Sequence, residues 1–222
     1  MALEDYERPS VTTDLVVFSV REGKLNALLI KRGVVPFKGG WALPGGFVNI
    51  DESIDEAAKR ELQEETGVKD IFLEQLYTWG EVDRDPRGRV ITVSYFALVK
   101  DNEVELKAST DAAEVKWFDV NKLPKLAFDH DKILKYAIQR LRWKFEYTTM
   151  AISLLPKKFS ISQLKNLYEV VFEREFDKRN FYKKILSLDI LDEKGMQENV
   201  AFRPAKLYSL KKGAESRVVA MV

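Results

Sequence analysis

Residues 46–68 read GFVNIDESIDEAAKRELQEETGV, and this stretch decides how the first half of the chain is interpreted. Ser53 followed three residues later by Glu56 is a capping box, which predicts that a helix begins there. The Gly45-Gly46 pair ahead of it predicts a turn in which the backbone comes close to that helix.

Three carboxylates are expected on one face of this helix, because Glu61, Glu64 and Glu65 fall at positions i, i+3 and i+4. Like charges that close repel each other, and a hard divalent cation such as Mg²⁺ or Mn²⁺ would offset the repulsion. Arg60 would hold the carboxylates, and the Gly46 backbone would approach the same metal. The alternative is a charged, solvated helix face that carries three acids by accident.

The spacing of residues along the whole stretch indicates a family more specifically than the capping box or the three carboxylates do. Gly46, Glu52, Arg60-Glu61-Leu62, Glu64-Glu65 and Gly67-Val68 fill every position of the Nudix box, so the first half resembles the Nudix hydrolase family. The resemblance implies an α/β/α sandwich with a mixed sheet, and substrates in which a nucleoside diphosphate is linked to another group. It also implies catalytic roles for Arg60, Glu61, Glu64 and Glu65, with Glu61 the candidate for assisting the attacking water. Some family members keep the fold and have lost turnover, so retained catalysis is left open.

A loop rich in arginine and aspartate follows the box, WGEVDRDPRGR at residues 79–89. Trp79 could stack on a base, and three side chains could contact phosphates or ribose: Arg84, Arg87 and Arg89. The alternative is a hairpin turn with solvated charges. This loop and WALPGGF at 41–47 resemble the corresponding parts of Nudix proteins that handle ADP-ribose, which makes ADP-ribose or a related ribose-phosphate the expected ligand.

The composition of the chain excludes several classes of protein and of chemical site. The 222 residues carry 36 basic and 35 acidic side chains, a net charge of +1 that is too balanced to indicate a partner. The absence of cysteine excludes disulfides, thiol nucleophiles and cysteine zinc sites. Without a membrane-length apolar run or signal-peptide pattern, the protein is expected to be soluble and cytoplasmic, with no membrane partner. The single histidine, His130, follows a candidate helix cap, Asp129, and a structural role is favoured for it.

The pattern changes along the chain, which indicates two domains, expected at residues 1–145 and 146–222. Up to Lys144 the net charge is −3, and from Phe145 onward it is +4. A helix from Asp129 to about Phe145 is expected to join the two domains. The first part holds four strand-like runs: Leu15–Phe18, Ala27–Ile30, Val90–Val99 and Val115–Phe118.

The second part reads as two helices and a hairpin, the order of a winged helix-turn-helix. Ser160 and Gln163 form a second capping box that opens the first of these helices. The next helix spans 177–188, and a hairpin with a turn at Gly195 follows. Candidate DNA contacts on this helix and the hairpin arms are Lys178, Arg179, Asn180, Lys183, Lys184, Arg203 and Lys206. The alternative is a helical accessory domain with a solvated basic surface.

The two parts together resemble the NrtR type of Nudix-related transcriptional regulators of NAD metabolism, over about residues 8–210. That resemblance implies a homodimer that binds operator DNA and senses ADP-ribose or a related sugar effector. Because Glu61, Glu64 and Glu65 are all present, hydrolysis of the effector is plausible. The alternative function is a Mg²⁺-dependent ADP-ribose diphosphatase that releases AMP and ribose 5-phosphate.

Overall fold

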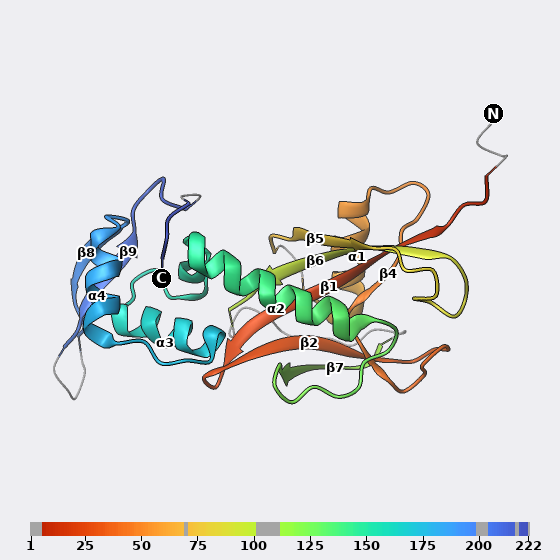
Figure 1. Ribbon diagram of the computed structural model, residues 1–222, viewed down its shortest axis with the longest axis horizontal. Helices are drawn as coiled ribbons and strands as arrows, with labels where there is room; N and C mark the ends of the chain where they lie inside the picture. Colours follow the sequence, from red (N-terminus) through yellow and green to blue (C-terminus); the bar gives the residue numbers. More distant parts are fainter. Residues whose placement is uncertain (1–5, 69–70, 101–111, 199–203, 216–217, 222) are drawn as a thin grey trace. The chain divides into compact units, whose positions relative to one another are not determined.

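The computed structural model describes residues 6–68, 71–100, 112–198, 204–215 and 218–221. The chain divides into a first unit, Met1–Ser19 with Asn26–Ala137, and a second unit, Val20–Leu25 with Ile138–Val222. Both are visible in Figure 1.

A seven-stranded mixed sheet forms the frame of the first unit. Its path is β3-β2-β1-β6-β5, with β4 paired to β1 and β7 paired to β2. The β1 and β6 strands run parallel, and the other pairs are antiparallel. The four predicted strands are confirmed as β1, β2, β6 and β7, whereas β3, β4 and β5 were not anticipated. The strand bounds are Ser10–Arg21 (β1), Lys24–Arg32 (β2), Trp41–Ala42 (β3), Gly45–Phe47 (β4), Glu74–Trp79 (β5), Val90–Leu98 (β6) and Ala112–Asp119 (β7).

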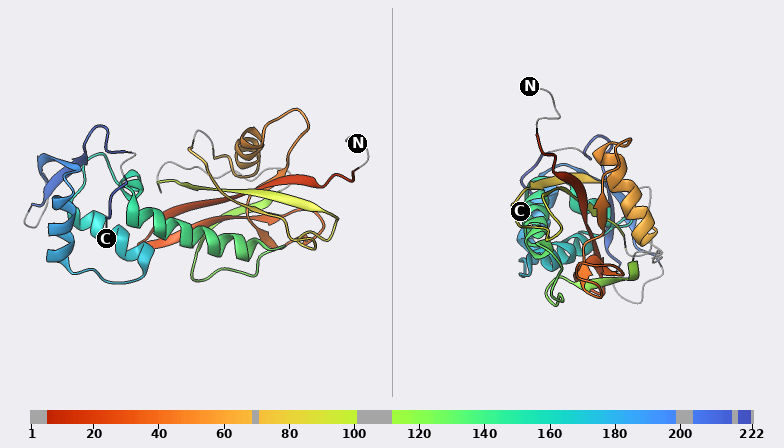
Figure 2. Two further views of the ribbon diagram at one scale, coloured as in Figure 1. Left: turned by 45° about the horizontal axis from the view of Figure 1, so that its top comes forward. Right: turned by 90° about the vertical axis from the view of Figure 1, so that its right-hand side faces the viewer.

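One helix covers each face of this sheet (Figure 2). Helix α1, Ile54–Thr66, begins with the predicted capping box, in which Ser53 and Glu56 bond reciprocally. Its Ala58 and Leu62 pack against Leu15 and Val17 of β1. Side chains alternate along a strand, so the β1 side chain between Leu15 and Val17 points to the other face of the sheet. Helix α2 begins on that face. The α/β/α arrangement is therefore confirmed.

The Gly45-Gly46 pair lies in strand β4, and the prediction of a turn there was wrong. Thr13 is the register partner of Gly46, and Asp14 is that of Gly45. A Cβ atom on Gly45 would stand 2.0 Å from the carbonyl oxygen of Thr13, and its φ is +147°. The glycines therefore allow the backbones of β4 and β1 to approach each other closely.

The second unit has the predicted order of helices and hairpin. Helices α3, Ile161–Phe172, and α4, Lys178–Ser187, are followed by the antiparallel strands β8, Leu191–Met196, and β9, Lys206–Leu210. A short 3₁₀ helix, η3, precedes them at Met150–Leu154. The Ser160–Gln163 capping box opens α3 as predicted.

Aromatic side chains form the core of the second unit. Tyr168 is fully buried, its hydroxyl donates to the carbonyl oxygen of Phe145 at 2.8 Å, and its ring packs edge-on against Phe181. Gly195 was expected in the hairpin turn but lies inside β8, where the pairing with β9 shifts between Glu193 and Met196. Gly195 has a positive φ, which glycine adopts in a strand irregularity as readily as in a turn. The turn prediction failed because the residue type alone does not distinguish the two.

Helix α2 spans His130–Tyr147, close to the predicted bounds. The limit between the two units falls inside it, between Ala137 and Ile138, and the expected domain limit after residue 145 also lies within this helix. None of the helices in the described part of the chain is long and apolar enough to cross a membrane.

Candidate functional site

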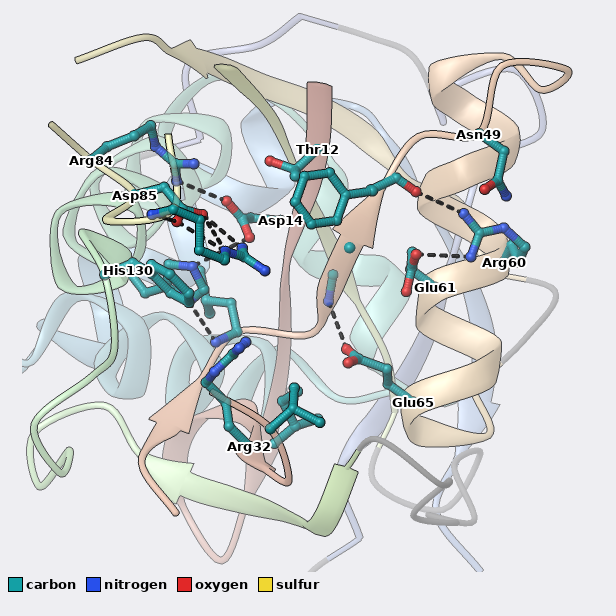
Figure 3. Close-up of a pocket in the computed structure, with 18 residues that line it drawn as sticks. Thr12, Asp14, Arg32, Asn49, Arg60, Glu61, Glu65, Arg84, Asp85 and His130 are labelled. Atoms are coloured by element: carbon teal, nitrogen blue, oxygen red, sulfur yellow. Dashed lines mark hydrogen bonds and ion pairs between the residues drawn. The ribbon is translucent and has the colours of Figure 1, made fainter. Parts of the chain in front are cut away.

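A cavity of about 300 Å³ opens in the first unit beside α1 (Figure 3). Its walls come from β1, β2, the β3–β4 segment, α1, the β5–β6 loop and the start of α2. The charged and aromatic side chains that line it are Asp14, Arg32, Phe47, Arg60, Glu61, Glu65, Arg84, Asp85, Arg87, Phe128 and His130.

Two carboxylates of the box lie in this cavity, Glu61 and Glu65. Glu65 is buried and accepts a hydrogen bond from the Gly45 backbone N–H at 2.7 Å. Glu61 lies against Gly46, where an added Cβ atom would stand 2.3 Å from the Glu61 Oε1 atom. The backbone of β4 therefore approaches both carboxylates as closely as glycine permits.

Arg60 holds the acidic side chains of the helix as predicted. Its guanidinium donates to Glu52 at 2.6 Å, to Glu61 at 2.8 Å and to Glu64 at 3.1 Å. Glu64 does not line the cavity, and its side chain is 57% exposed. The structure therefore brings Glu61 and Glu65 together and leaves Glu64 on the outer side of Arg60.

The two cavity carboxyls are poised for a cation. Burial, with the nearby Glu61 charge, raises the pKa of Glu65 to about 8, and burial also raises the pKa of Glu61. A divalent cation would stabilise both ionised forms, and Gly46 lines the same cavity. Within the described ranges, no group of three or more acids or histidines is close enough to hold a metal ion by itself. The residues present fit a metal that also takes oxygens from a bound ligand.

A buried ion network closes the opposite side of the cavity, as Figure 3 shows for Arg84, Asp14 and His130. Arg84 Nη2 lies 2.7 Å from Asp129 Oδ1 and 3.1 Å from Asp14 Oδ2. Asp129 directly precedes α2 as predicted, and its carboxylate binds Arg84 with two oxygens. The arginine therefore ties the β5–β6 loop to β1 and to the start of α2.

His130 is fixed at both ring nitrogens. Nδ1 accepts a hydrogen bond from the Leu43 N–H at 2.9 Å, and Nε2 lies 3.3 Å from Asp14 Oδ1. Because Nδ1 accepts, the proton of the neutral ring is on Nε2 and points to Asp14. Burial alone would raise the pKa of Asp14, but His130 and Arg84 lower it to about 2. The histidine is structural, as favoured from sequence, and it also lines the cavity.

The predicted ligand contacts of the arginine-rich loop divide into two groups. Arg84 and Arg87 line the cavity, where Arg87 also forms a bidentate pair with Asp85. Trp79 does not line it, because it ends β5 and its Nε1 donates to the Ser94 hydroxyl at 3.0 Å. Arg89 does not line it either, because its guanidinium donates to the Gly80 and Glu81 carbonyls.

Sequence reasoning missed several cavity residues, among them Asp14, Arg32 and Phe128. Asp14 interrupts an apolar strand, which is a usable signal because a charge in a buried strand needs a partner. Arg32 ends β2, and Phe128 has a φ of +53°, a strained value for a residue with a bulky side chain. Only the folded chain brings these two residues together.

Helix α4 of the second unit presents a basic surface. Lys178, Arg179, Asn180, Lys183 and Lys184 all lie on it and are exposed, and within the described part of the chain none of the four cations has an ion pair. Lys206 of β9 is exposed but pairs with Glu193 at 3.0 Å. Arg203, the remaining predicted contact, lies outside the described residues.

Comparisons with known families agree with this division of the chain. The NUDIX domain family matches residues 10–139, and the NrtR DNA-binding winged helix domain family matches residues 151–210. The chain belongs to the NrtR branch of the Nudix family. An ADPR-responsive transcriptional repressor of Acinetobacter baylyi is 38% identical to it over 208 residues, which cover 92% of this chain and 83% of the relative.

Two further relatives provide evidence on the function of this NrtR-type protein. The crystal structure of Shewanella oneidensis NrtR complexed with a 27mer DNA superposes with a TM-score of 0.79 at 33% identity, covering 94% of this chain and 96% of that one. An ADP-ribose pyrophosphatase of Methanocaldococcus jannaschii is 46% identical over 139 residues, which cover 63% of this chain and 77% of the relative. The first likeness spans both units, and the second spans the Nudix part.

Proposed function

We propose that this protein is a DNA-binding transcriptional regulator whose Nudix cavity binds ADP-ribose. The observation that carries the proposal is the presence, in one chain, of a charged Nudix cavity and of a winged helix unit with an unpaired basic helix. The repressor and DNA-complex relatives, similar over nearly the whole chain, support it. Its site of action is then the cytoplasm, where bacterial operator DNA is located.

Helix α4 is the proposed recognition helix. Its exposed cations contact phosphates, and Arg179, Asn180 and Lys183 are able to reach base edges in the major groove. Lys206 of β9 contacts the adjacent backbone. A homodimer would place two such helices on half-sites about one helical turn apart.

Salt dependence tests this assignment. The Arg179→Ala, Lys183→Ala double variant should bind upstream DNA more weakly and with a shallower salt dependence between about 50 and 200 mM, because fewer phosphates are neutralised. Lys157→Ala with Lys158→Ala is the charge-matched control, since both lysines are exposed in the same unit and lie outside α4. Equal salt slopes for the double variant and the wild type would refute the role of α4.

The cavity residues fit a Mg²⁺ or Mn²⁺ ion together with a diphosphate. Glu61, Glu65 and the Gly46 carbonyl would hold the cation, which supplies positive charge to the phosphate oxygens when bound. Glu64 would act through Arg60, to which it is paired. Arg84 and Arg87 bring guanidinium groups to the same cavity, and this supports a phosphorylated ligand.

Hydrolysis of ADP-ribose is a second function that the intact acidic pair favours. A water molecule would attack phosphorus with Glu61 assisting, and the P–O bond of the diphosphate would break to give AMP and ribose 5-phosphate. Support comes from the two carboxylates in the cavity and from the likeness to the pyrophosphatase.

One assay separates the two roles of the Nudix unit. AMP release from ADP-ribose is measured with Mg²⁺ for the wild type and the Glu61→Gln, Glu65→Gln variant, and ADP-ribose binding is titrated in parallel. Many turnovers that the variant loses would establish the hydrolase. Binding without turnover would leave a sensor only. Absence of binding at millimolar ADP-ribose with Mg²⁺ would refute the proposed ligand.

The regulator also predicts coupling between the two units. Adding ADP-ribose should change the affinity for operator DNA, because effector and operator then bind different arrangements of the protein with different affinity. The test is a DNA titration with and without ADP-ribose. An identical dissociation constant under saturating ADP-ribose would refute a sensing role.

A further inference from the structure

Four arginines line the Nudix cavity, and three of them are already neutralised by carboxylates. Arg60 pairs with Glu52, Glu61 and Glu64, Arg84 pairs with Asp14 and Asp129, and Arg87 pairs with Asp85. The fourth is Arg32, for which the described ranges contain no ion pair. Its guanidinium is therefore the cavity cation with charge left for a ligand.

Arg32 is held in a defined position. It is the last residue of β2, and its Nε donates to the Pro36 carbonyl oxygen at 2.8 Å. Its guanidinium carbon lies over the Phe128 ring, 4.9 Å from the ring centre. A planar cation fixed on an aromatic ring loses little freedom on binding, and its remaining N–H groups are left for an acceptor.

The neighbouring aromatic rings are occupied by guanidinium groups. Arg87 lies 5.6 Å from the centre of the Phe128 ring and 4.9 Å from that of Phe47. Two guanidinium groups lie over the Phe128 ring, so stacking a nucleobase on that ring would require displacing an arginine. The arrangement favours an anion over a base at this end of the cavity.

The electrostatic environment of Arg32 also favours an anion. The side chain is half-buried, and burial and the positive charge of Arg87 lower its pKa more than the nearby carboxylates of Glu65, Asp85 and Asp14 raise it. A diphosphate, which carries two negative charges, would remove the repulsion of the two guanidiniums when placed between them. Phe128 supports this geometry at the cost of a strained backbone, with φ at +53°, and such strain is concentrated at functional positions.

We propose that Arg32, stacked on Phe128, is a ligand-binding residue that contacts the diphosphate of the ligand. The inference rests on the proposed ADP-ribose site and assigns its phosphate end to a residue outside the Nudix box. Because the contact is made by a fixed guanidinium, it contributes to binding whether or not a divalent cation is present.

The test is calorimetric titration of the full chain with ADP-ribose and with inorganic pyrophosphate, in EDTA and in Mg²⁺. Arg32→Gln should weaken binding of both by about 30-fold in either condition, which is the effect of losing one charge-assisted contact. Arg32→Lys keeps the charge without the planar group, so its affinity should lie between those of the wild type and Arg32→Gln. Lys31→Gln is the matched control, since the adjacent Lys31 is not part of the cavity lining and pairs with Glu114 at the surface.

The outcomes separate the inference from the proposed function. If the wild type binds both compounds and Arg32→Gln binds them within twofold, the inference is overturned and the proposed function stands. If the wild type binds pyrophosphate alone and Arg32→Gln loses it, the diphosphate site stands and ADP-ribose is not the ligand. If the wild type binds neither, both fail. A thermal melt of Arg32→Gln that matches the wild type confirms that the loss is local.

Discussion

Replacing Arg84 by leucine should destabilise the first unit by about 3–5 kcal/mol at neutral pH. The side chain is 3% exposed and is the shared counter-charge of Asp14 and Asp129, with N–O distances of 3.1 and 2.7 Å. Leucine occupies similar space and leaves two buried carboxylates without a cation. Removing one partner from a buried pair is strongly destabilising, because the other charge stays desolvated.

The pH dependence of this loss of stability follows from the pKa of Asp14. Its folded pKa of about 2 lies below the ordinary value of 3.8, so the pairing contributes about 2 kcal/mol above pH 4, and this is lost as pH falls through 2. His130 contributes to the same shift, so only part of that energy disappears with Arg84. The difference between wild type and variant should therefore be largest near pH 7 and should narrow as pH falls below 4.

Urea unfolding followed by tryptophan fluorescence measures the effect, with hydrogen exchange to assign it to the first unit. The control is Arg89→Leu in the same loop, where an exposed arginine contacts only backbone carbonyls, and about 1 kcal/mol or less is expected. An Arg84→Leu protein as stable as the Arg89→Leu protein at pH 7 would refute the reasoning. So would a stability difference that stays constant from pH 7 to pH 3.

Three further predictions follow from positions described above. Gly45→Ala should cost at least about 2 kcal/mol in thermal unfolding, because its Cβ atom meets the β1 backbone at 2.0 Å. Gly80→Ala should be nearly neutral, because its Cβ atom would make an ordinary contact of 4.0 Å with Arg89 Nη2. If the proposed hydrolysis takes place, Glu65→Gln should lower the rate of AMP release by about 100-fold or more and Glu64→Gln by about tenfold or less, because of these two residues Glu65 alone lines the cavity. The reverse order would contradict the site. Tyr168→Phe should lower the stability of the second unit by about 1 kcal/mol, since one buried hydrogen bond is lost; an unchanged denaturation midpoint would count against that bond.

Local chemistry made much of the fold predictable. The capping boxes at Ser53 and Ser160 involve residues three positions apart, so the sequence alone contains both partners, and α1 and α3 begin where predicted. The apolar runs of β1 and β6 are long enough to indicate buried strands. The short strand β4 was missed because its two glycines have no side-chain pattern, and its pairing with β1 is a long-range contact.

The site was predictable only where its residues are close in sequence. Arg60, Glu61 and Glu65 lie on one helix, so their shared surface follows from helical spacing. Arg84 was expected to contact ligand, but its two carboxylate partners lie 70 and 45 residues away along the chain. The pairing of Arg32 with Phe128 depends in the same way on how the sheet and α2 fold together, which no local pattern encodes.

The continuity of α2 fixes the helical phase between two sets of buried side chains, one in each unit. Ile133, Leu134 and Ala137 are buried before the limit between the units, and Leu141 and Phe145 are buried after it. One residue inserted between Ala137 and Ile138 would turn the later set by about 100° relative to the earlier one and advance it by about 1.5 Å. A seven-residue insertion, close to two full turns, would nearly restore the original orientation. A length change in this helix therefore keeps the two sets of buried side chains in phase only when it comes close to whole turns.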